Sequence, residues 1–317
     1  MDRILVTGTS GFVGRHLLTR LKREGRELTL AGRSFSRTEV GRTVKTLVVG
    51  EIGPRTDWSA ALEGCGIVIH MAGQVPGPGV SASDFDTVNN EGTARLAEQA
   101  FASGVKLFVL LSSIFAVVDH TTEIPIDDLS FPPSATTPYG LSKSAAEAHI
   151  ANFARSGRIG VSLRPPLVYG KNAKGNWLRL QRLAATQLPL PFGNVHNRRS
   201  FIAVENLVDA LVRVVSSATD RDVSGVYAVA DEDVVSTADT VKWLRDGMGL
   251  SPRLLPVDVG ILNLLLNLTG QTSMAQSLLG NLEVNSSRFR RVFQWEPPVT
   301  SREGIKASGA QFLAGRR

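Results

Sequence analysis

RILVTGTSGFVG, residues 3–14, is the stretch that decides the fold. Its first five residues predict a buried β-strand, and a helix is expected from Arg15 to about Glu24. Glycines at 8, 11 and 14 allow a tight turn, a close approach of a pyrophosphate to the backbone, and close packing of the helix on the strand. A glycine-rich turn without a ligand is the alternative, but the order strand, turn, helix favours dinucleotide binding. The residues of this stretch expected at the cofactor are Gly8, Ser10, Gly11, Phe12, Val13 and Gly14.

The alternation of strand and helix continues to about residue 170 and then breaks, and a later helix and strand at 205–230 return to the sheet. Strands that alternate with helices pair in parallel, so we predict an α/β fold with a doubly wound parallel sheet of the Rossmann type. The sheet is expected to use residues 1–170, with 200–230 returning to it. Residues 171–199 and 231–317 are expected to form a smaller C-terminal lobe that binds the substrate. Further strands are expected at 27–31, 46–50, 67–72, 105–111, 160–164 and 226–230, and helices at 84–103, 138–153 and 205–217.

A second motif is Thr137-Pro-Tyr-Gly-Leu-Ser-Lys143. Thr137 suits a helix N-cap and Pro138 the first helical position, so Tyr139 and Lys143 are expected one turn apart on one helix face. A cation beside a phenol favours the phenolate, so Tyr139 is expected to exchange a proton nearer neutral pH. Ser113, at the carboxyl end of a predicted strand, is expected to hydrogen-bond the reacting oxygen. The alternatives are a capping serine and a surface tyrosine on an amphipathic helix.

The residues that follow the second strand bear on the choice of cofactor. At NAD sites an acid usually binds the adenosine ribose there, but this chain has Arg33, with Arg37 nearby. A guanidinium pairs with a ribose 2′-phosphate, so we expect NADP rather than NAD; a solvated loop arginine is the alternative. Asn89 is expected among the cofactor residues, holding a helix kink and a water near Lys143; a polar residue of the helix face is the alternative. The other residues expected to line the cofactor are Glu51, Ile52, Met71, Ala72, Gly73, Pro166 and Val168, with Tyr139 and Lys143 at its reactive end.

The composition argues against several classes of function. The chain has 317 residues, 43% of them hydrophobic, a net charge of +6 and a single cysteine, Cys65. One cysteine allows neither an internal disulfide nor a cysteine-based metal site, and we expect no metal. No basic run carries interleaved aromatic residues, so nucleic acid is not an expected partner, whereas a positive charge suits anionic ligands. His70, inside an apolar strand, is expected to be a packed core histidine rather than a ligand.

Two segments bear on location. Met1-Asp2-Arg3 leads straight into a predicted strand without a signal peptide, so a cytoplasmic location is expected. The apolar run 260–268 is too short to span a bilayer. We expect this run to form a packed helix, and contact with a membrane surface is the alternative.

Together, these motifs resemble the extended short-chain dehydrogenase/reductase family, in its NAD(P)-dependent sugar-nucleotide epimerase/dehydratase branch. The stretches 163–170, 175–176 and 190–193 resemble a narrower group that makes bacterial polysaccharide precursors and includes UDP-hexose 4-epimerases and 4-ketoreductases. The resemblance implies that Tyr139 is the acid/base, that Lys143 binds the nicotinamide ribose, and that Ser113 orients the reacting oxygen. It also implies substrate contacts at Ser112, at Asn176 and Trp177 near the diphosphate, at Pro191 and Phe192 near the uracil, and at Arg199 on the diphosphate.

Three departures from the family pattern shape the expected function. Leu167 stands where epimerases often have asparagine, the acid after the second strand is missing, and residues 114–118 lack the usual tyrosine-glycine or asparagine-glycine. The resemblance implies hydride transfer at C4 of a UDP-hexose, and the first two departures favour a 4-ketoreductase over a UDP-glucose or UDP-N-acetylglucosamine 4-epimerase. A reductase of a non-nucleotide carbonyl compound and a non-catalytic NADP-binding protein are further alternatives. The resemblance also implies that the protein can form a homodimer.

Overall fold

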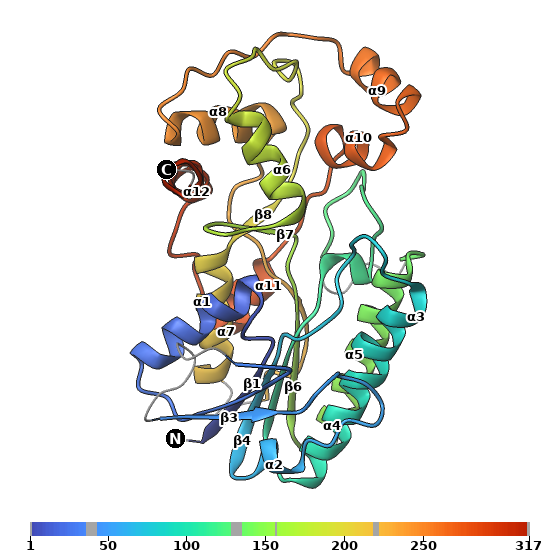
Figure 1. Cartoon of the computed structure of the whole chain (residues 1–317), viewed down its shortest axis with the longest axis vertical. Coiled ribbons are helices and arrows are strands. Elements are labelled where there is room, and N and C mark those ends of the chain that lie inside the picture. Colours follow the sequence, from blue (N-terminus) through green and yellow to red (C-terminus); the bar gives the residue numbers. More distant parts are fainter. Residues whose placement is uncertain (1, 36–42, 128–134, 156, 218–221, 316–317) are drawn as a thin grey trace.

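The structure is a computed structural model that describes residues 2–35, 43–127, 135–155, 157–217 and 222–315. Arg37 therefore lies outside the described residues. The described residues form a seven-stranded parallel sheet and a separate pair of short strands, which confirms the predicted α/β fold (Figure 1). In spatial order the strands of the large sheet are β3 (Val44–Val48), β2 (Leu28–Gly32), β1 (Arg3–Thr7), β4 (Cys65–His70), β5 (Leu107–Leu111), β6 (Ile159–Arg164) and β9 (Gly225–Ala228).

The strand order reverses beside β1, and this reversal sets the position of the site. Thr7, the last residue of β1, pairs with Ala31 of β2 on one side and with His70 of β4 on the other. Ligands of doubly wound sheets bind outside the carboxyl ends of the strands at such a reversal. The glycine turn after β1 and the residues after β4 therefore meet at one crevice.

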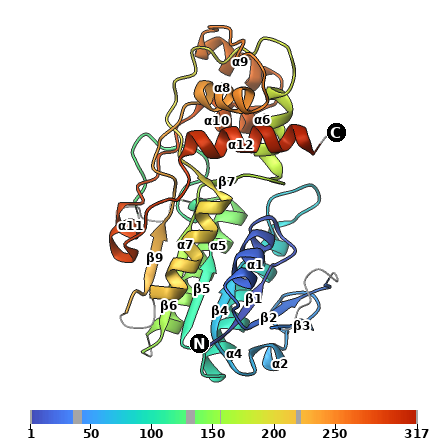
Figure 2. The ribbon, with the colours of Figure 1, turned by 90° about the vertical axis from the view of Figure 1, so that its left-hand side faces the viewer.

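Helices cover both faces of the sheet (Figures 1 and 2). On one face, α1 (Phe12–Arg23) and α7 (Val204–Ser217) bury leucine and valine side chains against β1 and β5. On the other face, α2 (Ser59–Leu62) and α5 (Pro138–Ala154) pack against the sheet, and aromatic side chains from β5 and from the helical layer fill the core between them. The start of α5 is as predicted, since the Thr137 hydroxyl accepts a hydrogen bond from the Gly140 N–H at 3.2 Å and Pro138 is the first helical residue.

The helix predicted at 84–103 is irregular. It consists of α3 (Ala82–Phe85), a π-helical segment η1 (Asp86–Glu91) and α4 (Gly92–Ala102). Asn89 lies in the π-helical segment, and its side chain is buried and hydrogen-bonded to neighbouring elements rather than to solvent. π-Helical turns commonly mark a functional position within a helix. The predicted helix is therefore present, since residues 82–102 are helical throughout, and the irregularity expected at Asn89 takes the form of a π-helical segment.

The two-stranded sheet was not predicted. It joins β7 (Leu167–Tyr169) to β8 (Phe201–Ala203), two three-residue strands that pair in parallel although more than thirty residues separate them. Three residues carry too little periodicity to predict a strand from sequence. The pair matters because β7 directly follows β6 and leads the chain out of the large sheet.

The C-terminal lobe is mainly helical and lies above the carboxyl ends of the strands (Figures 1 and 2). Two of its helices, 237–247 and 301–314, pack so closely at Gly247 that a side chain there would clash: a Cβ would lie 1.9 Å from the Lys306 carbonyl oxygen. Among the described residues, no helix has the length and apolar character needed to cross a bilayer. The helices of the lobe are α6 (Gly175–Ala184), α8 (Thr237–Gly247), α9 (Val259–Leu268), α10 (Thr272–Leu279) and α12 (Ser301–Ala314). Two further elements lie at the large sheet: α11 (Ser287–Phe293) packs near β9, and the 3₁₀ turn η2 (Ile114–Ala116) follows β5.

A buried polar cluster joins this lobe to the sheet. The Asp231 carboxylate accepts hydrogen bonds from the Tyr169 hydroxyl at 2.8 Å, from the Asn206 amide at 2.7 Å and from the Ala203 N–H at 3.1 Å. Burial raises the pKa of Asp231 to about 6, and these hydrogen bonds oppose the rise. The cluster therefore fixes β7, β8 and α7 relative to one another at the base of the lobe.

Candidate active site

A cleft of about 460 Å³ lies at the carboxyl ends of β1, β2 and β4. Gly8 has φ +77°, and a Cβ there would lie 2.6 Å from the Ala72 nitrogen; a Cβ at Gly14 would lie 2.1 Å from the Gly8 carbonyl oxygen. Only glycine fits at these positions, which leaves the backbone open to a pyrophosphate at the start of α1. The residues present therefore fit a dinucleotide. Of the predicted cofactor residues, the cleft is lined by Gly8, Ser10, Gly11, Arg33, Glu51, Ile52, Met71, Ala72 and Gly73.

Several predicted cofactor residues do not line this cleft. Phe12, Val13 and Gly14 form the first turn of α1 instead, and Phe12 faces a separate cleft between α1 and α12. Pro166 and Val168 line the second cavity described below. Gln74 and Val75, which follow Gly73 and were also expected beside the cofactor, line the cleft too. Sequence reasoning missed Thr9, Ser34, Phe35 and Val88, which surround the cleft because the loops after β1 and β2 and the helical segment η1 converge there.

Arg33 and Glu51 face each other at the rim of the cleft. The guanidinium lies 3.4 Å from the carboxylate, and their side chains are 73% and 81% exposed. An ion pair this exposed contributes little to stability. Both groups are therefore available to a ligand: Arg33 to a phosphate, and Glu51 to ribose hydroxyls in place of the acid missing after β2.

Lys174 also lines the cofactor cleft, although it belongs to the C-terminal lobe. It is exposed, and its ammonium group has no hydrogen-bond or ion-pair partner within the described part of the chain. The loop that carries it lies against α1, where the His16 ring is 3.3 Å from the Lys171 carbonyl oxygen. No local sequence signal places this lysine, because the contact joins residues about 160 positions apart.

Tyr139 and Lys143 lie one turn apart on α5, as predicted. The Lys143 ammonium donates a hydrogen bond to the Leu111 carbonyl oxygen at 2.7 Å, and burial lowers the pKa of Lys143 to about 8, with the Glu147 carboxylate acting in the opposite direction. Burial raises the pKa of Tyr139, while its hydrogen bond with Ser113 opposes the rise. The expected lowering of the Tyr139 pKa is therefore not found, because desolvation of the phenol outweighs its partners.

The two serines after β5 have different partners. The Ser113 hydroxyl bonds to Tyr139 and also accepts the Phe115 N–H at 3.2 Å, so it both meets the phenol and caps η2. The Ser112 hydroxyl donates to Glu147 at 2.5 Å. Arg164 binds the same carboxylate through two hydrogen bonds of 2.9 and 2.6 Å. Ser112 therefore offers a substrate only the remaining lone pairs of its oxygen.

Asn89 holds the loop after β4 against α5. Its amide nitrogen donates to the Gln74 carbonyl oxygen and to the Ser142 hydroxyl, both at 3.0 Å, and its oxygen accepts the Gln74 N–H at 2.7 Å. These contacts use the whole amide, so Asn89 shapes the wall of the site without facing the cofactor cleft.

His70 is the packed core histidine expected. Its ring is hydrogen-bonded to the Thr7 hydroxyl at 2.7 Å, and burial lowers the pKa of His70 to about 3.

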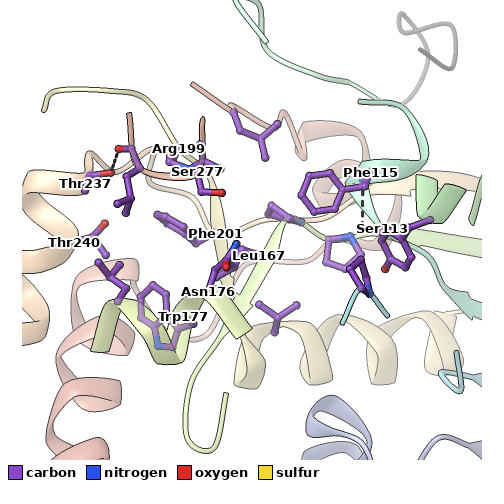
Figure 3. A pocket seen from close by; sticks show the side chains of 18 of the residues that line it. Ser113, Phe115, Leu167, Asn176, Trp177, Arg199, Phe201, Thr237, Thr240 and Ser277 are labelled. Atoms are coloured by element: carbon purple, nitrogen blue, oxygen red, sulfur yellow. Dashed lines mark hydrogen bonds between the residues drawn. The ribbon is translucent and has the colours of Figure 1, made fainter. Parts of the chain in front are cut away.

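A second cavity of about 340 Å³ begins at Tyr139 and extends into the C-terminal lobe. Figure 3 shows Ser113 and Phe115 at one end and Arg199, Thr237 and Thr240 at the other. Its walls are mainly apolar, and its predicted members are Ser112, Ser113, Tyr139, Asn176, Trp177, Arg199, Pro166 and Val168. Its members that sequence reasoning missed include Thr237, Thr240, Ser277, Leu278 and Phe201.

Three residues predicted at the substrate have structural partners. Trp177 is buried, donates its indole N–H to the Ser308 hydroxyl at 2.9 Å and stacks on Tyr169, so it offers the cavity only part of its ring. Phe192 packs in the core of the lobe, and neither it nor Pro191 lines the cavity. The turn that holds both is fixed by the Gly193 N–H, which donates to the Leu255 carbonyl oxygen at 2.9 Å.

Arg199 is the main cation of the cavity. Its side chain is 7% exposed and donates to the carbonyl oxygens of Gly280 at 2.9 Å and Gln276 at 3.3 Å. Burial lowers the pKa of Arg199 to about 10, so the guanidinium stays charged at neutral pH. Within the described residues it has no carboxylate partner. A buried guanidinium without a counter-ion favours an anionic ligand.

The family model for the NAD dependent epimerase/dehydratase family matches residues 4–230. The chain belongs to this family. The match begins at β1 and ends just after β9, so it spans the large sheet and the residues Tyr139 and Lys143. Among the described residues of this family member, no group of three or more His, Cys, Asp or Glu side chains could hold a metal ion.

Individual relatives of this epimerase/dehydratase-family chain are similar over most of its length. It is 32% identical to a UDP-glucose 4-epimerase of Vibrio cholerae, over 98% of this chain and 95% of that protein. It is 28% identical to a ceramide reductase of Caulobacter vibrioides, over 82% and 75%. The structure of a UDP-glucuronic acid 4-epimerase from Bacillus cereus, solved with NAD, matches with a TM-score of 0.76 at 18% identity, over 99% and 100%. That last likeness shows the fold.

Proposed function

We propose that this protein transfers hydride at C4 of a UDP-hexose. The observation that carries the proposal is that one cavity joins Tyr139 to the buried, uncompensated Arg199. A sugar diphosphate nucleotide has the matching form, a reactive ring at one end and a diphosphate at the other. The similarity to a UDP-glucose 4-epimerase over nearly the whole chain supports the same substrate class.

The residues at the inner end of the cavity supply proton transfer. The nicotinamide, when bound, supplies or accepts the hydride. Tyr139 gives a proton to, or takes it from, the oxygen on the sugar carbon, and Ser113 holds that oxygen in line with the phenol. Lys143 keeps its position through the Leu111 carbonyl oxygen, one helical turn from Tyr139. Gly8, Gly11 and Ser10 would hold the cofactor diphosphate at the start of α1.

Within this class we propose a 4-ketoreductase that uses NADPH. Arg33 at the rim of the cofactor cleft suits a 2′-phosphate, and Leu167 gives the cavity an apolar side chain where epimerases often have asparagine. A reductase releases its oxidised cofactor after each turnover, so it gains nothing from permanent retention of NAD. A cytoplasmic location and a homodimer remain predictions from the sequence, as does the division into a sheet domain and a substrate lobe.

A 4-epimerase is the second candidate. The similarity to the Vibrio cholerae enzyme favours it, and so does Glu51, whose carboxylate reaches the same rim as Arg33 and suits the ribose hydroxyls of NAD. An epimerase returns the hydride to the same sugar, so tight retention of NAD helps it.

A carbonyl reductase for a lipid-like substrate is the third candidate. The apolar walls of the cavity and the similarity to a ceramide reductase favour it. The buried charge of Arg199 argues against a neutral substrate at that end of the cavity, because it would remain without a counter-ion.

A product assay separates these candidates. The protein is incubated with NADPH and UDP-4-keto-6-deoxy-N-acetylglucosamine, and separately with UDP-glucose. The reductase proposal expects one alcohol formed for each NADPH oxidised, and no stoichiometric NAD in the purified protein. If the protein instead interconverts UDP-glucose and its C4 epimer without any change in cofactor absorbance, the reductase proposal is wrong and the epimerase proposal takes its place. Failure with both substrates, together with no thermal shift by UDP, would refute the nucleotide-sugar class.

A further inference from the structure

Helix α9 (Val259–Leu268) turns its apolar stripe away from the protein. Ile261, Leu264, Leu265 and Leu268 are 54%, 59%, 55% and 76% exposed, and their spacing of three and four residues places them on one face. A helix packed in a core buries such a stripe. Here Leu262 is the residue of α9 that is buried, and the predicted packed helix is packed on that one side only.

Helix α9, which carries the exposed stripe, lies at the end of the molecule away from the large sheet (Figures 1 and 2). α9 packs against α10, which carries the half-exposed Met274. On its other side α10 contributes Ser277 and Leu278 to the substrate cavity, and the Gln276 carbonyl oxygen accepts a hydrogen bond from Arg199. One helix therefore separates the exposed stripe from the cavity.

The charges of the lobe complement an anionic surface. Residues 259–282 contain no Asp, Glu, Lys, Arg or His, so nothing charged interrupts the apolar segment. The segments 171–199 and 231–317 carry 16 Lys and Arg against 9 Asp and Glu, but Arg199, Arg245 and Asp231 are buried, and three of the arginines belong to α11 beside β9. The remaining 11 Lys and Arg still exceed the remaining 8 Asp and Glu, so the lobe carries a modest positive excess. Basic surfaces beside an apolar helix are attracted to anionic lipid headgroups.

We propose that the apolar face of α9 inserts into the headgroup region of an anionic lipid bilayer and holds the C-terminal lobe at the membrane surface. A second copy of the chain fits this face less well. A ten-residue helix is about 15 Å long, and its exposed stripe is about 10 Å wide, on the order of 150 Å², whereas stable dimers bury about 800 Å² on each partner. A bilayer sets no such minimum, since the binding grows with each inserted side chain.

The test is vesicle flotation of the full chain, without cofactor or substrate. Vesicles contain either phosphatidylcholine alone or phosphatidylcholine with about one third phosphatidylglycerol. Wild-type protein is expected to float with the anionic vesicles and less with the neutral ones, and salt should weaken the binding. The double variant Leu264→Gln with Leu268→Gln should bind roughly tenfold less or worse, since glutamine keeps the helix propensity but not the apolar surface. Leu188→Gln is the matched control, because Leu188 is 68% exposed in the same lobe but lies outside α9.

A second measurement guards against a folding defect in the double variant. Leu268→Trp should show an emission shift to the blue when anionic vesicles are added, and no shift would overturn the proposal. It is equally overturned if wild-type protein ignores both vesicles, or if the double variant floats as well as wild type. A concentration-dependent dimer that the double variant abolishes, without vesicle binding, would assign the face to a second copy. None of these outcomes depends on the reaction catalysed, because neither leucine lines the cavity.

Discussion

Replacement of Arg199 by alanine tests the substrate class directly. The guanidinium is 7% exposed, has two carbonyl partners and no carboxylate among the described residues, so its remaining N–H groups are free to meet an anion in the cavity. A hydrogen bond to a charged group is worth about 1.5–3 kcal/mol. Arg199→Ala should therefore raise the dissociation constant of UDP by roughly 10- to 150-fold, at 1.4 kcal/mol for each factor of ten.

Its neighbour provides a matched control. Arg198 is 63% exposed and its guanidinium pairs with Glu283 at 2.6 Å, outside the cavity. Arg198→Ala should leave the affinity for UDP within about twofold of wild type, since exposed pairs contribute about 0–1 kcal/mol and this one does not face the ligand. Arg199→Lys keeps the charge but loses the fork, so it should fall between wild type and alanine.

Isothermal titration with UDP measures all three variants, after the melting temperature of each free protein has shown that it folds. Equal losses in Arg198→Ala and Arg199→Ala would mean that the effect is general electrostatics rather than a contact. Wild-type protein that does not bind UDP at millimolar concentration would refute the reasoning altogether.

The remaining predictions concern the cofactor and the catalytic residues. Tyr139→Phe removes one hydroxyl, so turnover should fall by roughly 10²–10⁴ while UDP affinity is kept, and near-normal turnover would contradict the assignment. Arg33→Ala should reduce the preference for NADPH over NADH by about tenfold in fluorescence titrations, and an unchanged ratio would show that Arg33 is a solvated loop residue. Lys174→Ala should weaken NADH and NADPH alike, by roughly two- to fivefold, because the exposed ammonium of Lys174 lines the cleft in which we propose that the cofactor binds. Lys171→Ala should not, because Lys171 lies outside this cleft. The pKa of Lys143 is about 8 in the folded protein and near 10.5 in the unfolded chain, so the unfolded state binds more protons between these pH values. The free energy of unfolding of wild type, measured against that of Lys143→Met in denaturant titrations, should therefore rise with pH across this window by up to about 3 kcal/mol.

The parts of the site that sequence predicts well are those fixed by local geometry. Thr137, Tyr139 and Lys143 lie within two helical turns, so spacing alone puts the phenol and the ammonium on one face. The glycine turn after β1 is equally local, because the positive φ of Gly8 and the close contact at Gly14 involve near neighbours. Arg199 was expected at the substrate from a resemblance to a family pattern; the structure places it in the cavity, and its contact with a substrate stays a prediction.

The parts that sequence could not predict depend on distant contacts. The pKa of Tyr139 is set mainly by burial, which no local spacing reveals. Trp177 is held in the lobe by Ser308, and Phe192 by the packing of the lobe core, so residues that resemble a family pattern became partly or wholly structural. Lys174 reaches the cofactor cleft only because the loop before α6 folds onto α1. The periodicity of α9 predicts an apolar stripe but not that solvent lies on the other side of it.

The end of the cavity at Tyr139 is held in shape by hydrogen bonds among the chain's own side chains. Glu147 accepts hydrogen bonds from Ser112 and Arg164, so the ends of β5 and β6 are tied to α5 within a turn of Lys143. A buried ion pair such as Arg164–Glu147 contributes little net stability, although removal of one partner is destabilising because it leaves the other charge buried and unpaired. We therefore interpret this arrangement as one that fixes the positions of these elements rather than one that stabilises the fold. The Leu111 carbonyl then receives the Lys143 ammonium at the same strand end. These contacts are all made by the chain's own groups, so they fix the positions of the phenol, the serine hydroxyl and the ammonium, and the binding energy of the proposed substrate is left for orienting its reacting group.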